Sequence, residues 1–139
     1  MERWFVDTAY AVALANVRDS LHSRALALDR QIDSEDVQLV TTEAVLLEIA
    51  TALRSVRLRQ IAVGAVERFW HNSVVVELTS DLLRESWEMY KRHADKEWSW
   101  VDTISFVVMR REGMTEALTS DHHFWQASFR ALLAPDENP

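Results

Sequence analysis

Four acidic side chains occupy positions that an α/β fold would bring together. Each follows a predicted strand or lies in the first two turns of a predicted helix: Asp7, Glu48, Asp102 and Asp121. Carboxylates that converge raise one another's pKa unless a cation lies among them. Hard oxygen ligands without Cys or His suit Mg²⁺ or Mn²⁺. Because such a cation can activate water and clamp a phosphodiester, the pattern predicts metal-assisted hydrolysis that needs no side-chain nucleophile.

Helix capping is the competing explanation for the same acids. Acids are common in first turns because they complement the helix dipole, and the chain contains 22 of them. Ser99 and Asp102 have the spacing of a capping box, with Asp in place of Glu. Glu43 competes with Glu48 because both lie early in one predicted helix, whereas Asp95 lies in a predicted solvated loop. Spacing alone leaves the metal site and the capping role both open.

Short β-rich runs alternate with helical patterns along the chain. Strands are predicted at residues 4–6, 37–40, 74–76 and 117–119, and a fifth within 129–132. Helical periodicity covers residues 21–32, 42–57, 58–69 and 83–90, and a further helix begins after residue 99. This alternation predicts an α/β fold, a three-layer α/β/α arrangement with a central parallel sheet of four to five short strands. Ligands of such sheets bind beyond the carboxyl ends of the strands.

Composition excludes several classes of protein. A length of 139 residues fits one domain, which we expect over residues 1–133, with a flexible tail at 134–139. Gly 2 and Pro 2 argue against a turn-dense sandwich or barrel. The lack of Cys excludes disulfides, zinc–thiolate sites and thiol catalysis. No apolar run approaches the roughly 20 residues that span a bilayer, and the first residues do not read as a signal peptide. We therefore expect a cytoplasmic protein without membrane contact.

The net charge bears on possible partners. The 15 basic and 22 acidic residues give −7, whereas proteins that hold nucleic acid by bulk charge are usually basic. Either the chain does not bind nucleic acid, or metal ions or a partner supply positive charge at the site. Two small basic clusters fit phosphate contacts and solvated helix surface equally well: Arg54, Arg57 and Arg59, and Lys91, Arg92 and Lys96.

Five stretches of the chain carry a familiar pattern. They cover residues 5–8, 19–25, 41–49, 98–106 and 117–124. The most specific are Trp98-Ser99-Trp100-Val101-Asp102 and Leu118-Thr119-Ser120-Asp121. Together they resemble the PIN-domain family, in particular VapC-like toxin ribonucleases, in the family's order and over nearly the whole chain. The resemblance implies a Mg²⁺- or Mn²⁺-dependent endoribonuclease that cleaves single-stranded or loop RNA.

The resemblance also assigns residues. It implies that the family's catalytic acids and metal ligands are Asp7, Glu48, Asp102 and Asp121, and that small hydroxyl residues in supporting roles are Thr8 and Ser99. It favours Glu48 over Glu43, because the family's acid follows an apolar pair. Related toxins often have Gly where this chain has Ser128, a departure that could alter a turn near the site.

Several side chains beside the third and fourth acids admit two roles. His122 and His123 would serve as a general base or metal ligands, or they would pack and hydrogen-bond near Asp121. Four aromatic residues would stack on splayed bases or belong to the core or an interface: Trp98, Trp100, Phe124 and Trp125.

The resemblance further implies two protein partners. We expect a homodimer formed through the helices at residues 42–57 and 58–69, and a small antitoxin that covers the acidic crevice. The alternative function is a catalytically inactive PIN-like scaffold that binds RNA or protein. A phospho-acceptor receiver domain fits poorly, because the third predicted strand runs into Glu77 instead of an Asp and the last Lys is Lys96.

Overall fold

The structure, a computed structural model, describes residues 1–134 and contains one five-stranded parallel sheet. The strands lie in the order β3-β2-β1-β4-β5 and span Arg3–Val6 (β1), Gln38–Thr42 (β2), Ser73–Val76 (β3), Glu116–Leu118 (β4) and Arg130–Ala131 (β5). Every neighbouring pair is parallel. The predicted α/β class and parallel sheet are therefore confirmed. The tail expected at residues 134–139 lies, apart from Ala134, outside the described residues.

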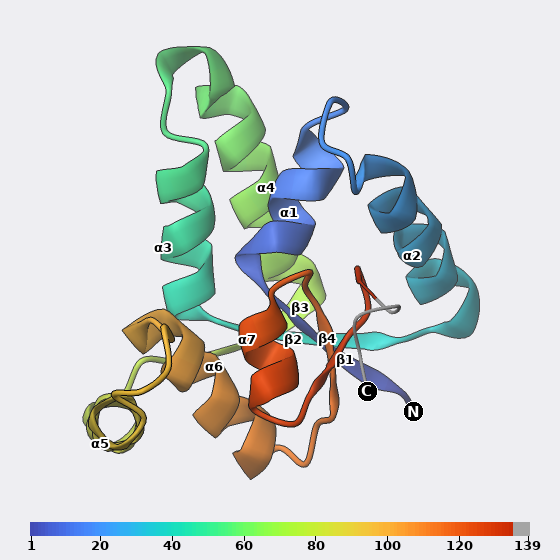
Figure 1. Cartoon of the computed structure of the whole chain (residues 1–139). Helices are drawn as coiled ribbons and strands as arrows, with labels where there is room; N and C mark the ends of the chain where they lie inside the picture. The colour runs from blue at the N-terminus through green and yellow to red at the C-terminus, as the bar shows by residue number, and fades with distance from the viewer. Residues whose placement is uncertain (135–139) are drawn as a thin grey trace.

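The helices form two groups around this sheet. They are α1 (Thr8–Ala15), α2 (His22–Glu35), α3 (Glu43–Ala52), a 3-10 turn η1 (Val56–Leu58), α4 (Arg59–Asn72), α5 (Ser80–Arg92), α6 (Trp100–Arg111) and α7 (His122–Gln126). Helices α1 to α4 pack on one another, while α5 packs along α6 and α6 packs against α7 (Figure 1). No helix within residues 1–134 is long and apolar enough to cross a membrane.

The strand order places a topological switch point between β1 and β4. From β1 the chain moves through β2 to β3 at one edge, and it then returns past β1 to β4 and β5. Right-handed connections therefore put α1 to α4 and α5 to α7 on opposite faces of the sheet. Asp7 follows β1 and Asp121 lies three residues beyond β4. Ligands of open parallel sheets bind at such a switch point, so the fold brings two acids to the expected place.

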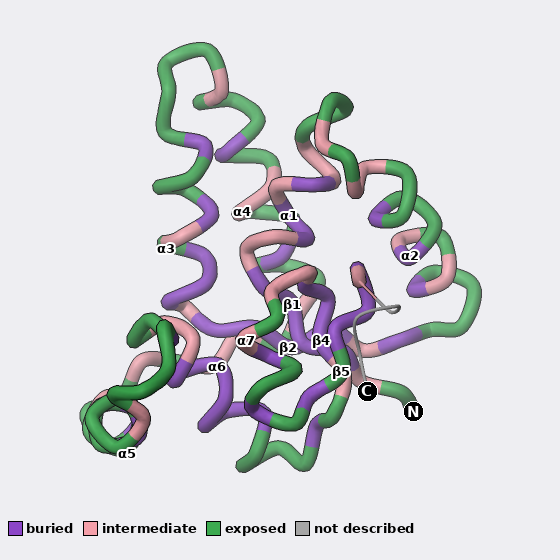
Figure 2. The backbone as a smooth tube through the Cα atoms, in the orientation of Figure 1, coloured by how far each residue is buried: buried purple, intermediate pink, exposed green. Residues whose placement is uncertain are grey.

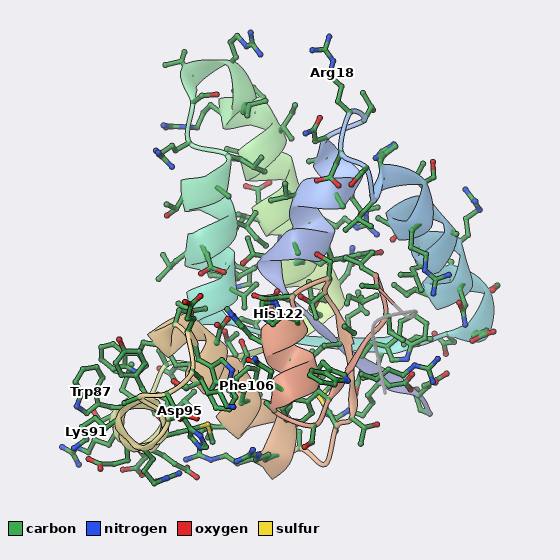
Figure 3. The ribbon with its side chains drawn as sticks, viewed as in Figure 1. Arg18, Trp87, Lys91, Asp95, Phe106 and His122 are labelled. Carbon is green, nitrogen blue, oxygen red and sulfur yellow. The ribbon has the colours of Figure 1, made fainter. Side chains whose placement is uncertain are left out.

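The core lies between the sheet and both helical groups, and the central strands are the most buried segments (Figure 2). Helix α6 is buried continuously from Thr103 to Met109, which agrees with its nearly uniform apolar sequence. Phe106 of α6 faces α7 (Figure 3), and its ring centroid lies 5.0 Å from that of Phe124 in an edge-to-face arrangement. This buried contact fixes the position of α7, and hence of the acid that precedes it.

Two helices were not predicted, and two local expectations were wrong. Sequence periodicity did not reveal α1 or α7, because α1 is apolar on every side and α7 has only five residues. Helix α3 ends at Ala52, so Val56 is 92% exposed instead of continuing the apolar face. On α5 the periodicity at residues 83–90 predicted an apolar face of Leu83, Trp87 and Tyr90, but the buried residues are Leu82, Ser86 and Met89, and Trp87 and Tyr90 are partly exposed.

Candidate functional site

The four predicted acids line a single cavity of about 480 Å³. Thr8 and Ser99 lie in the same cavity, together with Ala9, Glu97, Ser120 and His123. Each acid lies in or directly before a different helix: α1, α3, α6 or α7. These helix starts surround the carboxyl ends of β1 and β4 (Figure 1). Residues separated by more than 110 positions thus share one polar hollow.

Asp7 is the most buried of the acids, with 7% of its surface exposed. It occupies the N-cap position of α1, but its side chain makes no capping hydrogen bond. Instead, Thr119 Oγ1 donates to Asp7 Oδ2 at 2.8 Å. Burial raises the pKa of Asp7 to about 7; the neighbouring Glu48 and Asp102 add to the increase, and hydrogen bonds from Thr119 and the Thr8 backbone oppose it. Local structure supplies no reason for a carboxylate here.

Glu48 is held from α1. The Thr8 hydroxyl donates a hydrogen bond to Glu48 Oε1, which links the first turn of α1 to the second turn of α3. Glu43 has a different role, because its Oε1 accepts a 2.7 Å hydrogen bond from the backbone N–H of Leu78. Glu43 therefore ties α3 to the segment after β3, and Glu48 is the acid of this helix that lines the cavity.

Asp102 completes the capping box that its spacing predicted. Its backbone N–H donates to Ser99 Oγ at 3.0 Å, and its Oδ2 accepts from the Ser99 backbone N–H at 2.9 Å. Burial is the main cause that raises the pKa of Asp102, with a further contribution from Asp121; the Ser99 N–H and His123 oppose the shift. Ser99 thus orients the third acid and starts α6.

Asp121 is the N-cap of α7, and Oδ1 accepts from the His123 backbone N–H at 2.9 Å. The His123 ring lies between two acids, with Nδ1 3.1 Å from Asp102 Oδ2 and 3.2 Å from Asp121 Oδ1. Thr119 also contributes here, because its Oγ1 accepts from the Asp121 backbone N–H at 3.1 Å. His122 is more exposed, at the start of α7 (Figure 3).

The donor set fits a divalent cation. One oxygen of each acid is engaged by a hydroxyl, an N–H or an imidazole: Asp7 Oδ2, Glu48 Oε1, Asp102 Oδ2 and Asp121 Oδ1. The second oxygen of each carboxylate is then a potential hard ligand, oriented by the bond to its partner. Among the described residues, one group of side chains also brings its ligand atoms within 4.8 Å of one another: Asp121, His122 and His123. The four carboxylates form an oxygen-rich set of the kind that hard cations accept, whereas the two imidazoles of this group suit a transition metal such as Mn²⁺ better than Mg²⁺.

Three neighbours of the acids were not assigned to the site from the sequence. Thr119 had been placed only in a strand, yet its buried hydroxyl joins Asp7 to Asp121. Glu97 and Ser120 also line the cavity. A hydroxyl residue two positions before a predicted ligand was a usable signal for Thr119, because Ser and Thr often hydrogen-bond the backbone two residues on. No comparable pattern marks Glu97.

The flanking aromatic residues divide into two kinds. Phe124 and Trp98 are buried, and Trp98 Nε1 donates to Gln126 Oε1 at 2.9 Å, so both belong to the core. Trp100 and Trp125 are 40% and 39% exposed. Trp100 nevertheless packs 4.8 Å from Trp87 and donates to Ser86 Oγ, which leaves Trp125 as the freer ring beside the site.

Ser128 ends α7 in a left-handed conformation, with φ of 74°. Its N–H donates to Trp125 O, and the N–H of Phe129 donates to Phe124 O, both at 2.9 Å. This pair of bonds defines a Schellman motif, in which Gly is preferred. We expected that the replacement of Gly by Ser128 could alter this turn. The turn still forms, but the Ser128 backbone adopts a positive φ that is unfavourable for a residue with a side chain.

The fold and the acidic cavity together define a class of protein. The model of the PIN domain matches residues 4–130, which is nearly the whole described chain. The chain belongs to the PIN domain family, as its motifs suggested, and nucleases of this family generally use divalent metal ions.

Similarity to individual proteins points to one kind of PIN protein. The chain is 36% identical over 126 residues to the 23S rRNA-specific endonuclease VapC20 of Mycobacterium tuberculosis, in strains CDC 1551 / Oshkosh and H37Rv, across 90% of this chain and 94% of that protein. The crystal structure of Mycobacterium tuberculosis VapC20, described as a Sarcin-Ricin loop cleaving toxin, matches with a TM-score of 0.78 and 33% identity. The matched region covers 90% of this chain and 95% of the VapC20 chain.

Proposed function

We propose that this protein is a metal-dependent endoribonuclease that cleaves phosphodiester bonds in single-stranded or loop RNA. The observation that carries the proposal is the convergence of Asp7, Glu48, Asp102 and Asp121 on one cavity at the switch point of the sheet. Buried Asp7 adds weight, because a carboxylate with a strongly perturbed pKa and no capping role is typical of a functional site.

The four acids would act as ligands of Mg²⁺ or Mn²⁺. When bound, such a cation supplies water activation and neutralises charge that develops on the phosphate. The residues around the acids orient them: Thr8 holds Glu48, Thr119 holds Asp7, and Ser99 holds Asp102. His123 keeps the third and fourth acids together through one ring nitrogen. We assign Thr8 and Ser99 supporting roles on these contacts.

Cation dependence is the direct test of this function. Stripped protein incubated with mixed RNA should cleave it in Mg²⁺ or Mn²⁺ and stop in EDTA. Ca²⁺ should support cleavage poorly, because it is larger than Mg²⁺ and is held in looser geometry. Undiminished cleavage in excess chelator would remove the basis of the proposal. If RNA binds without being cut under any of these cations, the inactive PIN-like scaffold becomes the better description.

We further propose that the protein is the toxin of a toxin–antitoxin pair and works in the cytoplasm. The support is its similarity to VapC20, which is described as a toxin and an rRNA-specific endonuclease. A small antitoxin with a basic segment would complement a cavity that concentrates carboxylates. Co-expression with this antitoxin should give a complex whose nuclease activity appears only after proteolysis of the partner. Free nuclease activity in the intact complex would contradict this assignment.

The homodimer remains a proposal, and the outer surface of α3 and α4 supports it. Leu47, Val63 and Trp70 are 65%, 42% and 58% exposed and line adjoining apolar hollows. Arg59 and Glu67 flank Val63 at steps of four residues in the same hollow. Two copies of α4 packed antiparallel about Val63 would therefore set Arg59 of each copy opposite Glu67 of the other.

Charge reversal tests this pairing. Light scattering should give about twice the 16.1 kDa chain mass for the wild type. Arg59→Glu should weaken the dimer, and the double variant with Glu67→Arg should restore it. A wild-type mass that stays at 16.1 kDa on concentration would refute the dimer.

A further inference from the structure

Three arginines project from the protein at the ends of two helices that begin or pass beside the acidic cavity. Arg18 lies in the connection after α1, and Arg54 and Arg57 lie in the connection between α3 and α4. All three are exposed. Helix α1 packs against α3 and α4, so both connections lie at the same end of the molecule, with Arg18 pointing outward (Figure 3). We call Arg18, Arg54 and Arg57 the arginine tips.

The charge pattern around the arginine tips is opposite to that of the whole chain. Residues 8–18 and 49–66 contain four arginines, the tips and Arg59, and no Asp or Glu. The complete chain has 22 acidic residues and a net charge of −7. A local basic surface on an acidic protein creates a potential that favours a polyanion at that surface alone.

The arginine tips are also free of acidic partners. Other arginines are neutralised by ion pairs, such as Arg3 with Glu112 and Arg68 with Asp29. Within residues 1–134, no carboxylate lies within 4.0 Å of the guanidinium groups of the tips. Arg54 uses one N–H to bond the carbonyl of Thr51, and its other donors remain available for an external anion.

Helix geometry sets the distance from the cavity to the tips. At 1.5 Å per helical residue, the end of α3 at Ala52 lies about 6 Å beyond Glu48, and Arg54 follows two residues later. The eight residues of α1 lead from Asp7 toward Arg18 over about 12 Å. A stacked strand advances about 3.4 Å per nucleotide, so the tips would meet phosphates roughly three nucleotides from a bond held in the cavity.

We propose that the arginine tips bind the phosphates of the RNA strand that leaves the acidic cavity. The proposal rests on the nuclease function and supplies what that function lacks, a positively charged surface in a chain of net charge −7. Arg59 is left out because it lines the apolar hollow assigned to the dimer. The contacts reach the backbone only, and they therefore strengthen binding without selecting a sequence.

The test compares two triple variants with the same change in charge. One is Arg18→Ala/Arg54→Ala/Arg57→Ala. The control is Arg30→Ala/Arg84→Ala/Arg110→Ala, which removes three exposed arginines from α2, α5 and α6 that belong to neither basic cluster. Fluorescence anisotropy in EDTA measures binding of a labelled RNA hairpin, and of the same hairpin with its flanking strands removed, over a range of salt. Cleavage kinetics in Mg²⁺ follow for both RNAs.

We expect the tip variant to lower the slope of log K against log salt by about 2, because each phosphate contact to a single strand contributes about 0.7. Its KM should rise for the long RNA, with little change for the trimmed RNA and little change in kcat. The control variant should match the wild type. Equal salt slopes for all three proteins would overturn the proposal while leaving the nuclease intact. If the wild type binds RNA more tightly than the tip variant but never cleaves it, the nuclease proposal is wrong and the RNA-binding surface stands.

Discussion

Replacing Asp7 by Asn should make the metal-free protein more stable while abolishing cleavage. The pKa of Asp7 rises from 3.8 to about 7, chiefly through burial. Between these two values Asp7 binds more protons in the folded state than in the unfolded state. Its contribution to the free energy of unfolding is therefore most favourable below pH 3.8 and is lost as the pH rises to about 7. Asn carries no charge at any pH in this window and escapes the loss.

The size of the effect follows from the shift. Each pKa unit corresponds to 1.36 kcal/mol, so a shift of about three units costs the wild type about 4 kcal/mol above pH 7. Asn keeps an oxygen that can accept from Thr119, but its amide needs a new acceptor, which makes this figure an upper bound. At pH 5 the gain should be about two fifths as large, because only part of the loss has then occurred.

Denaturant unfolding in EDTA at pH 5 and pH 8 measures both quantities. Asp95→Asn is the matched control, because Asp95 is 72% exposed and should show no comparable gain. Addition of Mg²⁺ should then stabilise the wild type more than Asp7→Asn, since a cation favours the charged carboxylate. An Asp7→Asn protein that is no more stable than the wild type at pH 8, or whose advantage is the same at both pH values, would refute the assignment of Asp7 as a strained ligand.

Four further outcomes are expected. Glu48→Gln, Asp102→Asn and Asp121→Asn should each lose most RNA cleavage and keep a wild-type circular dichroism spectrum, because each removes one negative charge from the cavity; full activity in any of them would remove that acid from the set. Thr119→Val should lose cleavage and about 1–3 kcal/mol of stability by unsatisfying buried Asp7, while Thr119→Ser should restore both. Ser128→Gly should stabilise by about 1 kcal/mol by relieving a positive φ, measured as a rise in Tm, and Ser128→Ala should not. Co²⁺ or Mn²⁺ should rescue EDTA-treated protein more fully than Ca²⁺ in a cleavage assay.

The strands could be predicted as short β-rich runs, and most helices could be predicted because their apolar residues recur at helical spacing. The same reasoning failed where burial is uniform or where the segment is short. Helix α1 is apolar on all sides, so it shows no periodic face. On α5 the buried positions include Ser86, whose hydroxyl bonds the carbonyl of Leu82 within the helix. Because helical periodicity was judged from apolar residues alone, it predicted that the neighbouring face, with Trp87 and Tyr90, would be buried.

The contacts that orient the site were less predictable than the acids themselves. Each acid stands at a strand end or in an early helical turn, and both signals are local. The link from Thr119 to Asp7 spans 112 residues, and the link from Thr8 to Glu48 spans 40. Such contacts depend on the strand order, which periodicity does not reveal. Ser128 differs, because its conformation has a local cause. Helix α6 ends at Gly113 with the same pair of hydrogen bonds and a φ of 65°. The turn at Ser128 therefore explains why related toxins often have Gly at that position.

The structure separates the acids that capping explains from those that it does not. Asp102 closes a capping box and Asp121 caps α7, so local structure would favour both residues without any cation. Asp7 forms no cap, is 7% exposed and has a raised pKa, and Glu48 lies beyond the first turn of α3. Burial of a carboxylate without a cationic partner is costly, and a chain that needed only stable helices would place Asn or Ser at position 7. Capping therefore leaves the carboxylates at Asp7 and Glu48 unexplained, and a cation shared by the four converging acids accounts for both.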